Sequence, residues 1–151
     1  MQVEHQYEQN LQWTKKIRDA IKDDKIVSLF QPIVDCKTQK IVKYESLIRM
    51  EDEKGEYISP MYFLDLAKKN KLYHELTKIV IEKTIQEFAN SKHQVSINLS
   101  VDDILNTEIV ELLKKRLEET GIGPRLVFEI IESEGIENFE NVMEFITDIK
   151  Q

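Results

Sequence analysis

The stretch Gln94-Val-Ser-Ile-Asn-Leu-Ser100 decides the fold of this chain. Its residues alternate between apolar and polar, which is typical of a strand with one covered face and one polar face. A helix is predicted next, from about Thr107 to Thr120, and Gly121-Ile-Gly-Pro124 ends it. A strand from Arg125 to Glu132 and a helix from about Asn138 to Lys150 follow. The order strand, helix, strand, helix implies a parallel sheet with right-handed crossovers.

Two strands and two helices are predicted upstream of this unit. The strands run from Ile26 to Val34 and from Ile41 to Met50, and a turn joins them. Because so short a connection joins neighbouring strands, this pair is expected to be antiparallel. The helices are predicted over Pro60 to Lys69 and about Tyr73 to Asn90, and a serine cap followed by a proline opens the first.

Alternating strands and helices of this kind can close into a (β/α) barrel. A complete barrel needs about 250 residues, whereas this chain has 151. We therefore predict an α/β fold that is the N-terminal half of a TIM-like (β/α) barrel, with its first two strands antiparallel. Residues 1–24 are predicted to form a linker or docking helix, and residues 25–151 the partial barrel. The helix carries an apolar stripe of Trp13, Ile17, Ala20 and Ile21.

Composition narrows the classes of partner. Charged residues make up 32% of the chain and hydrophobic residues 41%, which is the balance of a soluble globular protein. The net charge of -7 argues against a nucleic-acid polymer or an anionic membrane surface as the main partner. No apolar run approaches the roughly 20 residues of a membrane span, and the N-terminus lacks a signal-peptide pattern, so no membrane insertion is expected.

Cysteine and histidine usage bears on compartment and on metal sites. Cys36 is the only cysteine, which excludes an internal disulfide framework and fits a reduced compartment. We therefore expect a cytoplasmic location. His5, His74 and His93 are scattered along the chain, which argues against a histidine-rich zinc site.

A second stretch, Lys43-Tyr-Glu-Ser-Leu-Ile-Arg49, combines charge with strand periodicity. Glu45 and Arg49 share one face of the predicted strand. A carboxylate and a guanidinium so placed are suited to hold a divalent metal and a phosphate side by side. Taken by itself, the stretch is more typical of an ordinary solvated edge strand.

Three strands carry a polar side chain toward their C-terminal ends, on the face that a barrel would turn inward: Glu45, Asn98 and Glu129. Active sites of such barrels lie at that rim. Two carboxylates and an amide oxygen are hard ligands that suit magnesium, manganese or calcium more than zinc. Asn98 alone is also typical of a hydrogen-bonding residue at a strand end, whereas Glu129 lies between two apolar residues and needs a partner.

Five short motifs occur in order along the chain. They are Phe30-Gln-Pro-Ile-Val-Asp35, Tyr44-Glu-Ser-Leu-Ile-Arg49, Ile58-Ser-Pro60 with Phe63 soon after, Ile97-Asn-Leu-Ser100, and Phe128-Glu-Ile-Ile-Glu-Ser133. In order and spacing they resemble the first half of EAL domains, which are bacterial phosphodiesterases that linearise cyclic di-GMP. The resemblance covers nearly the whole chain from about Trp13.

The resemblance implies roles for particular residues. Glu45, Asn98 and Glu129 would be metal ligands. The cofactor expected for a complete domain is Mg²⁺ or Mn²⁺, with two ions that activate a water for in-line attack on phosphorus. Contacts to the dinucleotide would come from Gln31, Leu47 and Arg49, the last through a phosphate. Glu132 would brace the loop after the last strand, which in the family helps to hold a metal ligand and to mediate dimerisation.

The chain departs from the family pattern in three places. Ser46 replaces the alanine of the name motif, but it points away from Glu45, so little harm is expected. Ile131 replaces a usual threonine. The chain ends at Gln151, before the strand that would carry paired aspartates and before a later lysine, glutamate and glutamine. We therefore expect this chain alone to be inactive and to bind cyclic di-GMP weakly or not at all. A non-catalytic, EAL-like nucleotide-binding or protein-interaction module is the alternative.

Self-association is the remaining expectation. Half a barrel leaves an unpaired strand edge, and the inward apolar side chains Val27, Leu29, Leu47 and Val127 lose the wall that should cover them. We predict a homo-oligomer, with a two-fold dimer favoured and the helix around Trp13 as a second candidate contact.

Overall fold

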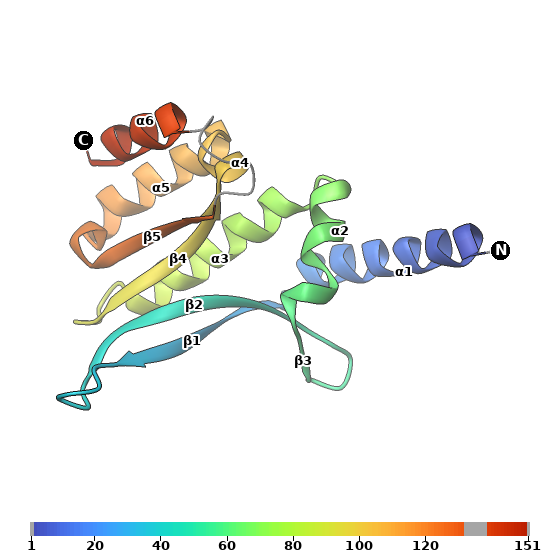
Figure 1. The fold of residues 1–151 in the computed structure, drawn as a ribbon, viewed down its shortest axis with the longest axis horizontal. Coiled ribbons are helices and arrows are strands. Elements are labelled where there is room, and N and C mark those ends of the chain that lie inside the picture. The colour runs from blue at the N-terminus through green and yellow to red at the C-terminus, as the bar shows by residue number, and fades with distance from the viewer. Residues whose placement is uncertain (1, 132–138, 151) are drawn as a thin grey trace.

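The computed structural model describes residues 2–131 and 139–150 (Figure 1). Four strands lie side by side in the order β1 (Ile26–Val34), β2 (Ile41–Glu51), β4 (Gln94–Ser100) and β5 (Leu126–Ile131). The pair β1–β2 is antiparallel, and the pairs β2–β4 and β4–β5 are parallel. A short strand, β3 (Tyr57–Ile58), pairs antiparallel with Met50 and Glu51 at the end of β2. The predicted mixed sheet is therefore confirmed.

Three helices cover one face of this sheet: α3 (Tyr73–Phe88), α5 (Thr107–Thr120) and α6 (Phe139–Lys150) (Figure 1). The main hydrophobic core lies between them and the apolar face of the strands. Ile97 and Leu99 of β4 are fully buried in this core, as the alternation predicts. Phe128 of β5 packs edge-on against Phe145 of α6, with 5.7 Å between ring centroids.

A second core holds α1 (Gln2–Lys22) and α2 (Leu64–Lys69) against the start of β1 and the end of β2. The expected stripe on α1 is present, because Ile17 and Ala20 are buried and Trp13 and Ile21 pack around them. The N-terminal end of α1 extends away from the sheet (Figure 1).

One predicted helix, Pro60 to Lys69, is wrong as a single element. It consists of a 3-10 turn, η1 (Pro60–Tyr62), and the separate helix α2. Ser59 caps the first piece as expected, since the Met61 N–H donates to its side chain. The break falls at Phe63, whose backbone leaves the helical region at φ -131° while its ring is fully buried in the second core.

Other boundaries need smaller corrections. The helix predicted to reach Asn90 ends at Phe88. The Arg125 guanidinium donates hydrogen bonds to the carbonyl oxygens of Phe88 and Ala89 at that end. A four-residue helix, α4 (Val101–Ile104), follows β4 and was not predicted. Gly121 ends α5 in the left-handed region at φ 68°, as predicted.

The opposite face of the sheet has no helix over it within the described residues (Figure 1). In the antiparallel pair, Leu29 lies opposite Leu47, and Gln31 lies opposite Glu45. The apolar side chains on this face are only partly buried, whereas Ile97 and Leu99 of β4 on the helix face are fully buried. We call this surface the inner face, because a closed barrel would turn it inward.

Candidate functional site

The inner face brings together the three predicted metal ligands. Asn98 of β4 and Glu129 of β5 are partners in the parallel ladder, and Glu45 of β2 pairs with Ser96, two residues before Asn98. Paired residues project to the same side of a sheet, and so do residues two apart on one strand. The Asn98 amide nitrogen donates a hydrogen bond of 3.3 Å to the Glu45 carboxylate.

Glu129 also has the charged partner that its apolar strand requires. The Lys43 ammonium lies 3.6 Å from the Glu129 carboxylate, with 28% and 41% of the two side chains exposed. Between these groups the Ser96 hydroxyl is fully buried and has no hydrogen-bond partner among the described residues. The inner face therefore carries a compact polar patch of Lys43, Glu45, Ser96, Asn98 and Glu129.

The chemistry of this patch fits part of a site for a hard divalent cation. Two carboxylates and one amide oxygen are of the right type, and they lie on adjacent strands. Mg²⁺ takes six oxygen ligands and usually keeps several waters among them, so three protein donors are enough for one ion but few for a two-metal site. Within residues 2–131 and 139–150, no group of three or more His, Cys, Asp or Glu side chains forms a metal cluster.

Arg49 lies beside this patch, at the edge of a cavity of about 150 Å³. The pairing of β2 with β4 stops at Glu45 and Ser96, and the cavity lies where the two strands separate. Leu47 and Asn98 also line it. One Arg49 nitrogen donates to the Ile48 carbonyl at 2.7 Å, which fixes the guanidinium at the rim.

The remaining predicted site residues lie in different places. Gln31 is exposed and lies opposite Glu45 on the inner face, and it does not line the cavity. Glu132 lies outside the described residues. Ser46 points to the helix side, as expected, where it is buried and shares a hydrogen bond of 2.8 Å with Thr84 of α3. The functional roles of all these residues stay predictions.

Sequence reasoning missed one wall of the cavity. Tyr73 and Thr77 of α3 line it opposite Arg49, and behind them lies the fully buried Asp103 of α4. Burial raises the pKa of Tyr73 to about 12, and the charge of Asp103 adds to the effect. The signal was present in Ser100-x-x-Asp103, whose spacing is that of a capping box.

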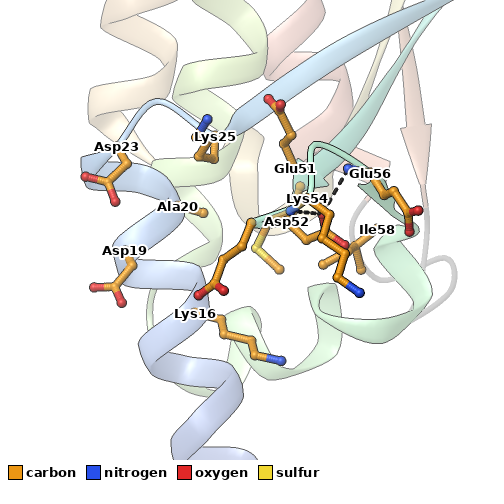
Figure 2. Close-up of a pocket in the computed structure, with 12 residues that line it drawn as sticks. Lys16, Asp19, Ala20, Asp23, Lys25, Glu51, Asp52, Lys54, Glu56 and Ile58 are labelled. Carbon is orange, nitrogen blue, oxygen red and sulfur yellow. Dashed lines mark hydrogen bonds between the residues drawn. The ribbon is translucent and has the colours of Figure 1, made fainter.

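A larger cavity of about 500 Å³ lies elsewhere, between α1 and the β2–β3 hairpin (Figure 2). Its charged lining is mostly acidic, with Asp19 on α1, Asp23 in the turn that follows this helix, and Glu51 and Asp52 on the hairpin. The Asp52 carboxylate accepts backbone hydrogen bonds from Lys54 and Glu56, so it is occupied in closing the hairpin turn. None of the predicted site residues lines this cavity.

Comparison with known proteins identifies the family. The EAL domain model matches residues 14–151. The chain belongs to the EAL domain family. The cyclic di-GMP phosphodiesterase PdeB of Shewanella oneidensis is 30% identical over 153 residues, which cover 96% of this chain and 18% of that protein. The probable cyclic di-GMP phosphodiesterase PdeB of Escherichia coli is 30% identical over 125 residues, which cover 79% of this chain and 24% of that protein.

Solved EAL structures confirm the fold. The Xanthomonas citri FimX EAL domain, solved in complex with c-diGMP, matches with a TM-score of 0.84 at 20% identity. The match covers 97% of this chain and 59% of that domain. The PaMucR phosphodiesterase, solved as a c-di-GMP complex, matches with a TM-score of 0.81 at 20% identity and covers 92% and 59% of the two chains. The chain thus spans less than two thirds of each of these relatives. No helix in the described part of the chain is long and apolar enough to cross a membrane.

Proposed function

We propose that this chain forms the N-terminal part of a cyclic di-GMP phosphodiesterase domain, and that its inner face contributes one side of the substrate site. The observation that carries this proposal is the contact between Asn98 and Glu45 at 3.3 Å, with Glu129 in register beside Asn98. Arg49 lies on the same strand face as Glu45, four residues on. A cationic side chain beside oxygen donors is the arrangement that a metal-bound phosphodiester needs.

In this proposal Glu45, Asn98 and Glu129 hold Mg²⁺ or Mn²⁺, and Gln31, Leu47 and Arg49 contact the dinucleotide. When bound, the metal supplies charge neutralisation at the phosphodiester and lowers the pKa of a water. Arg49 binds and orients a phosphate. Glu132, after β5, braces the following loop. The two-metal mechanism needs protein ligands for two ions, whereas these residues supply only three oxygen donors. We therefore propose that the 151-residue chain by itself does not hydrolyse cyclic di-GMP.

The test measures binding and turnover separately. The chain is incubated with cyclic di-GMP and Mn²⁺, and linear pGpG is assayed by chromatography. Binding is followed by calorimetry for the wild type and for Glu45→Ala, Asn98→Ala, Glu129→Ala and Arg49→Ala. We expect no pGpG, and weak binding that each substitution lowers. Glu118→Ala on the exposed surface of α5 is the matched control. If Glu129→Ala leaves the affinity as unchanged as the control does, the polar patch is not part of the site.

One observation favours a non-catalytic role. Lys43 neutralises Glu129, and Asn98 presents its amide nitrogen to Glu45, so the predicted ligands already have partners within the protein. A site whose carboxylates are paired in this way also suits a nucleotide-binding or protein-interaction module that holds no metal. Cyclic di-GMP binding that is equal with Mn²⁺ and with a chelator would favour this second function.

We further propose a homodimer, a cytoplasmic location, and a linker or docking role for residues 1–24. The partly exposed inner face supports the dimer, because Val27, Leu29, Leu47 and Val127 have no helix over them in the described chain. Sedimentation across a concentration series tests it. A monodisperse monomer at high micromolar concentration would contradict the dimer and leave the nucleotide site untouched.

A further inference from the structure

A buried carboxylate, Asp103, connects two elements that border the cavity beside Arg49. Its side chain is fully enclosed. Burying a carboxylate is strongly unfavourable unless its oxygens are paired. Each oxygen has a partner here: Oδ2 accepts the Ser100 N–H at 2.9 Å, and Oδ1 accepts the Thr77 hydroxyl at 3.0 Å. His74 Nδ1 lies 3.2 Å from Oδ1 and donates to it, because a carboxylate only accepts.

The two oxygens serve different elements. The bond to Ser100, together with the return bond from the Asp103 N–H to the Ser100 hydroxyl at 3.1 Å, is the capping box that starts α4. The bonds to Thr77 and His74 cross to α3. A helix cap alone needs only the first oxygen. The second oxygen ties the end of β4 to the first turns of α3.

Both ends of this connection reach the cavity. Thr77 lines it, and so does Tyr73, whose pKa is raised in part by the charge of Asp103. On the other side, Ser100 ends β4 two residues after Asn98, which also lines the cavity. Asp103 therefore touches the α3 wall and the β4 wall at once, although it does not line the cavity itself.

We propose that Asp103 is a positioning residue of the nucleotide site, which sets the distance between the α3 wall at Tyr73 and Thr77 and the Asn98 end of β4. This inference rests on the proposed function. A wall that is held by a buried, fully paired carboxylate keeps its shape without the ligand, and pre-organisation of this kind raises affinity. Asp103 acts through these neighbours and makes no contact with the nucleotide.

The experiment titrates cyclic di-GMP with Mg²⁺, which is diamagnetic, into the 151-residue chain and follows chemical shifts by NMR. Asp103→Ala removes both acceptor oxygens, and Asp103→Asn keeps one of them and the shape. We expect affinity to fall about tenfold in Asp103→Ala and about threefold in Asp103→Asn, since small displacements of a site weaken it strongly. In Asp103→Ala the ¹⁵N shift of His74 Nδ1 should also lose the signature of its hydrogen bond.

Arg125→Met is the matched control. Arg125 anchors the opposite end of α3 through the Phe88 and Ala89 carbonyls at 2.9 and 3.1 Å, and it does not line the cavity. This variant should lose stability yet keep its affinity within about twofold. An affinity loss as large in Arg125→Met as in Asp103→Ala would show that Asp103 is merely structural. If Asp103→Ala does not fold, the same comparison is made with Asp103→Asn.

A second readout separates this inference from the proposed function. The side-chain amide resonances of Asn98 are compared in the ligand-free proteins. If the wild type does not bind cyclic di-GMP, the proposed function fails. The Asn98 resonances of the ligand-free proteins still show whether Asp103 positions Asn98. A shift in the Asp103 variants but not in Arg125→Met supports the positioning role. Unchanged Asn98 resonances in a folded Asp103→Ala protein overturn it.

Discussion

The two faces of the sheet differ in what surrounds them. The helix face is mostly apolar and is most tightly packed at β4, where Ile97 and Leu99 are at zero exposure. The inner face is mixed, with partly exposed Leu29, Leu47 and Val127 around a polar patch. The same strands therefore place the side chains that stabilise the fold on one face and the side chains of the candidate site on the other. Alternation allows this division, because adjacent residues on one strand project to different faces.

The largest effect should come from a matched pair of truncations, one on each face. Ile97→Ala removes a fully buried side chain and should cost about 3 kcal/mol of unfolding free energy. Leu47→Ala removes a partly exposed side chain on the inner face and should cost about 1 kcal/mol. Urea denaturation of both variants measures the difference. Equal losses would mean that something covers the inner face, and losses for Leu47→Ala that grow with protein concentration would identify a second copy.

A smaller effect is expected at Ser46 and Thr84, which join the sheet to α3 on the helix face. Both side chains are buried and share a hydrogen bond of 2.8 Å. Ser46→Ala or Thr84→Val alone leaves one buried hydroxyl without its partner and should cost about 1–2 kcal/mol. The double variant should cost less than the sum of the two. Strict additivity in the double-mutant cycle would show that the hydroxyls do not interact.

Tyr73 predicts a pH dependence at the border between the two faces. Its pKa is raised to about 12 from 10, first by burial and then by the charge of Asp103. The folded state therefore holds this proton more tightly than the unfolded state. The resulting stability is fully present below pH 10 and is lost as the pH rises to 12. Tyr73→Phe should flatten the stability profile between these values, and an unchanged slope in denaturation at pH 9 to 12 would contradict the shift.

The smallest effect concerns Lys43, whose ammonium group forms an ion pair with Glu129 on the inner face at 3.6 Å. Lys43→Met removes a positive charge beside the proposed ligands, so Mn²⁺ affinity should rise about threefold. Paramagnetic broadening of NMR signals measures this affinity. Lys114→Met is the control, because Lys114 pairs with Asp148 at 2.6 Å on the helix side. If the Mn²⁺ affinity of Lys114→Met rises equally, the effect comes from the net charge of the protein and not from the position of Lys43.

Much of the fold could be predicted from short-range pattern. Alternation located β1, β2, β4 and β5, and turn and cap residues such as Gly121 located helix ends. The break at Phe63 could not be predicted, because it depends on where the ring fits in the second core. Only part of the candidate site could be predicted from the alternation of side chains along the strands. The face of Glu45, Asn98 and Glu129 follows from strand parity, whereas the cavity beside Arg49 follows from the point at which β2 and β4 separate.

The sequence by itself determined which residues share a face, the direction of neighbouring strands, and the EAL family to which the chain belongs. These properties depend on residues close together in the chain, where the backbone period governs side-chain direction. Only the tertiary structure decided that Lys43 pairs with Glu129 and that Asp103 reaches Thr77, 26 positions earlier. The first contact depends on the order and register of β2, β4 and β5, and the second on how α3 packs beside α4. A local sequence pattern contains no information on either arrangement.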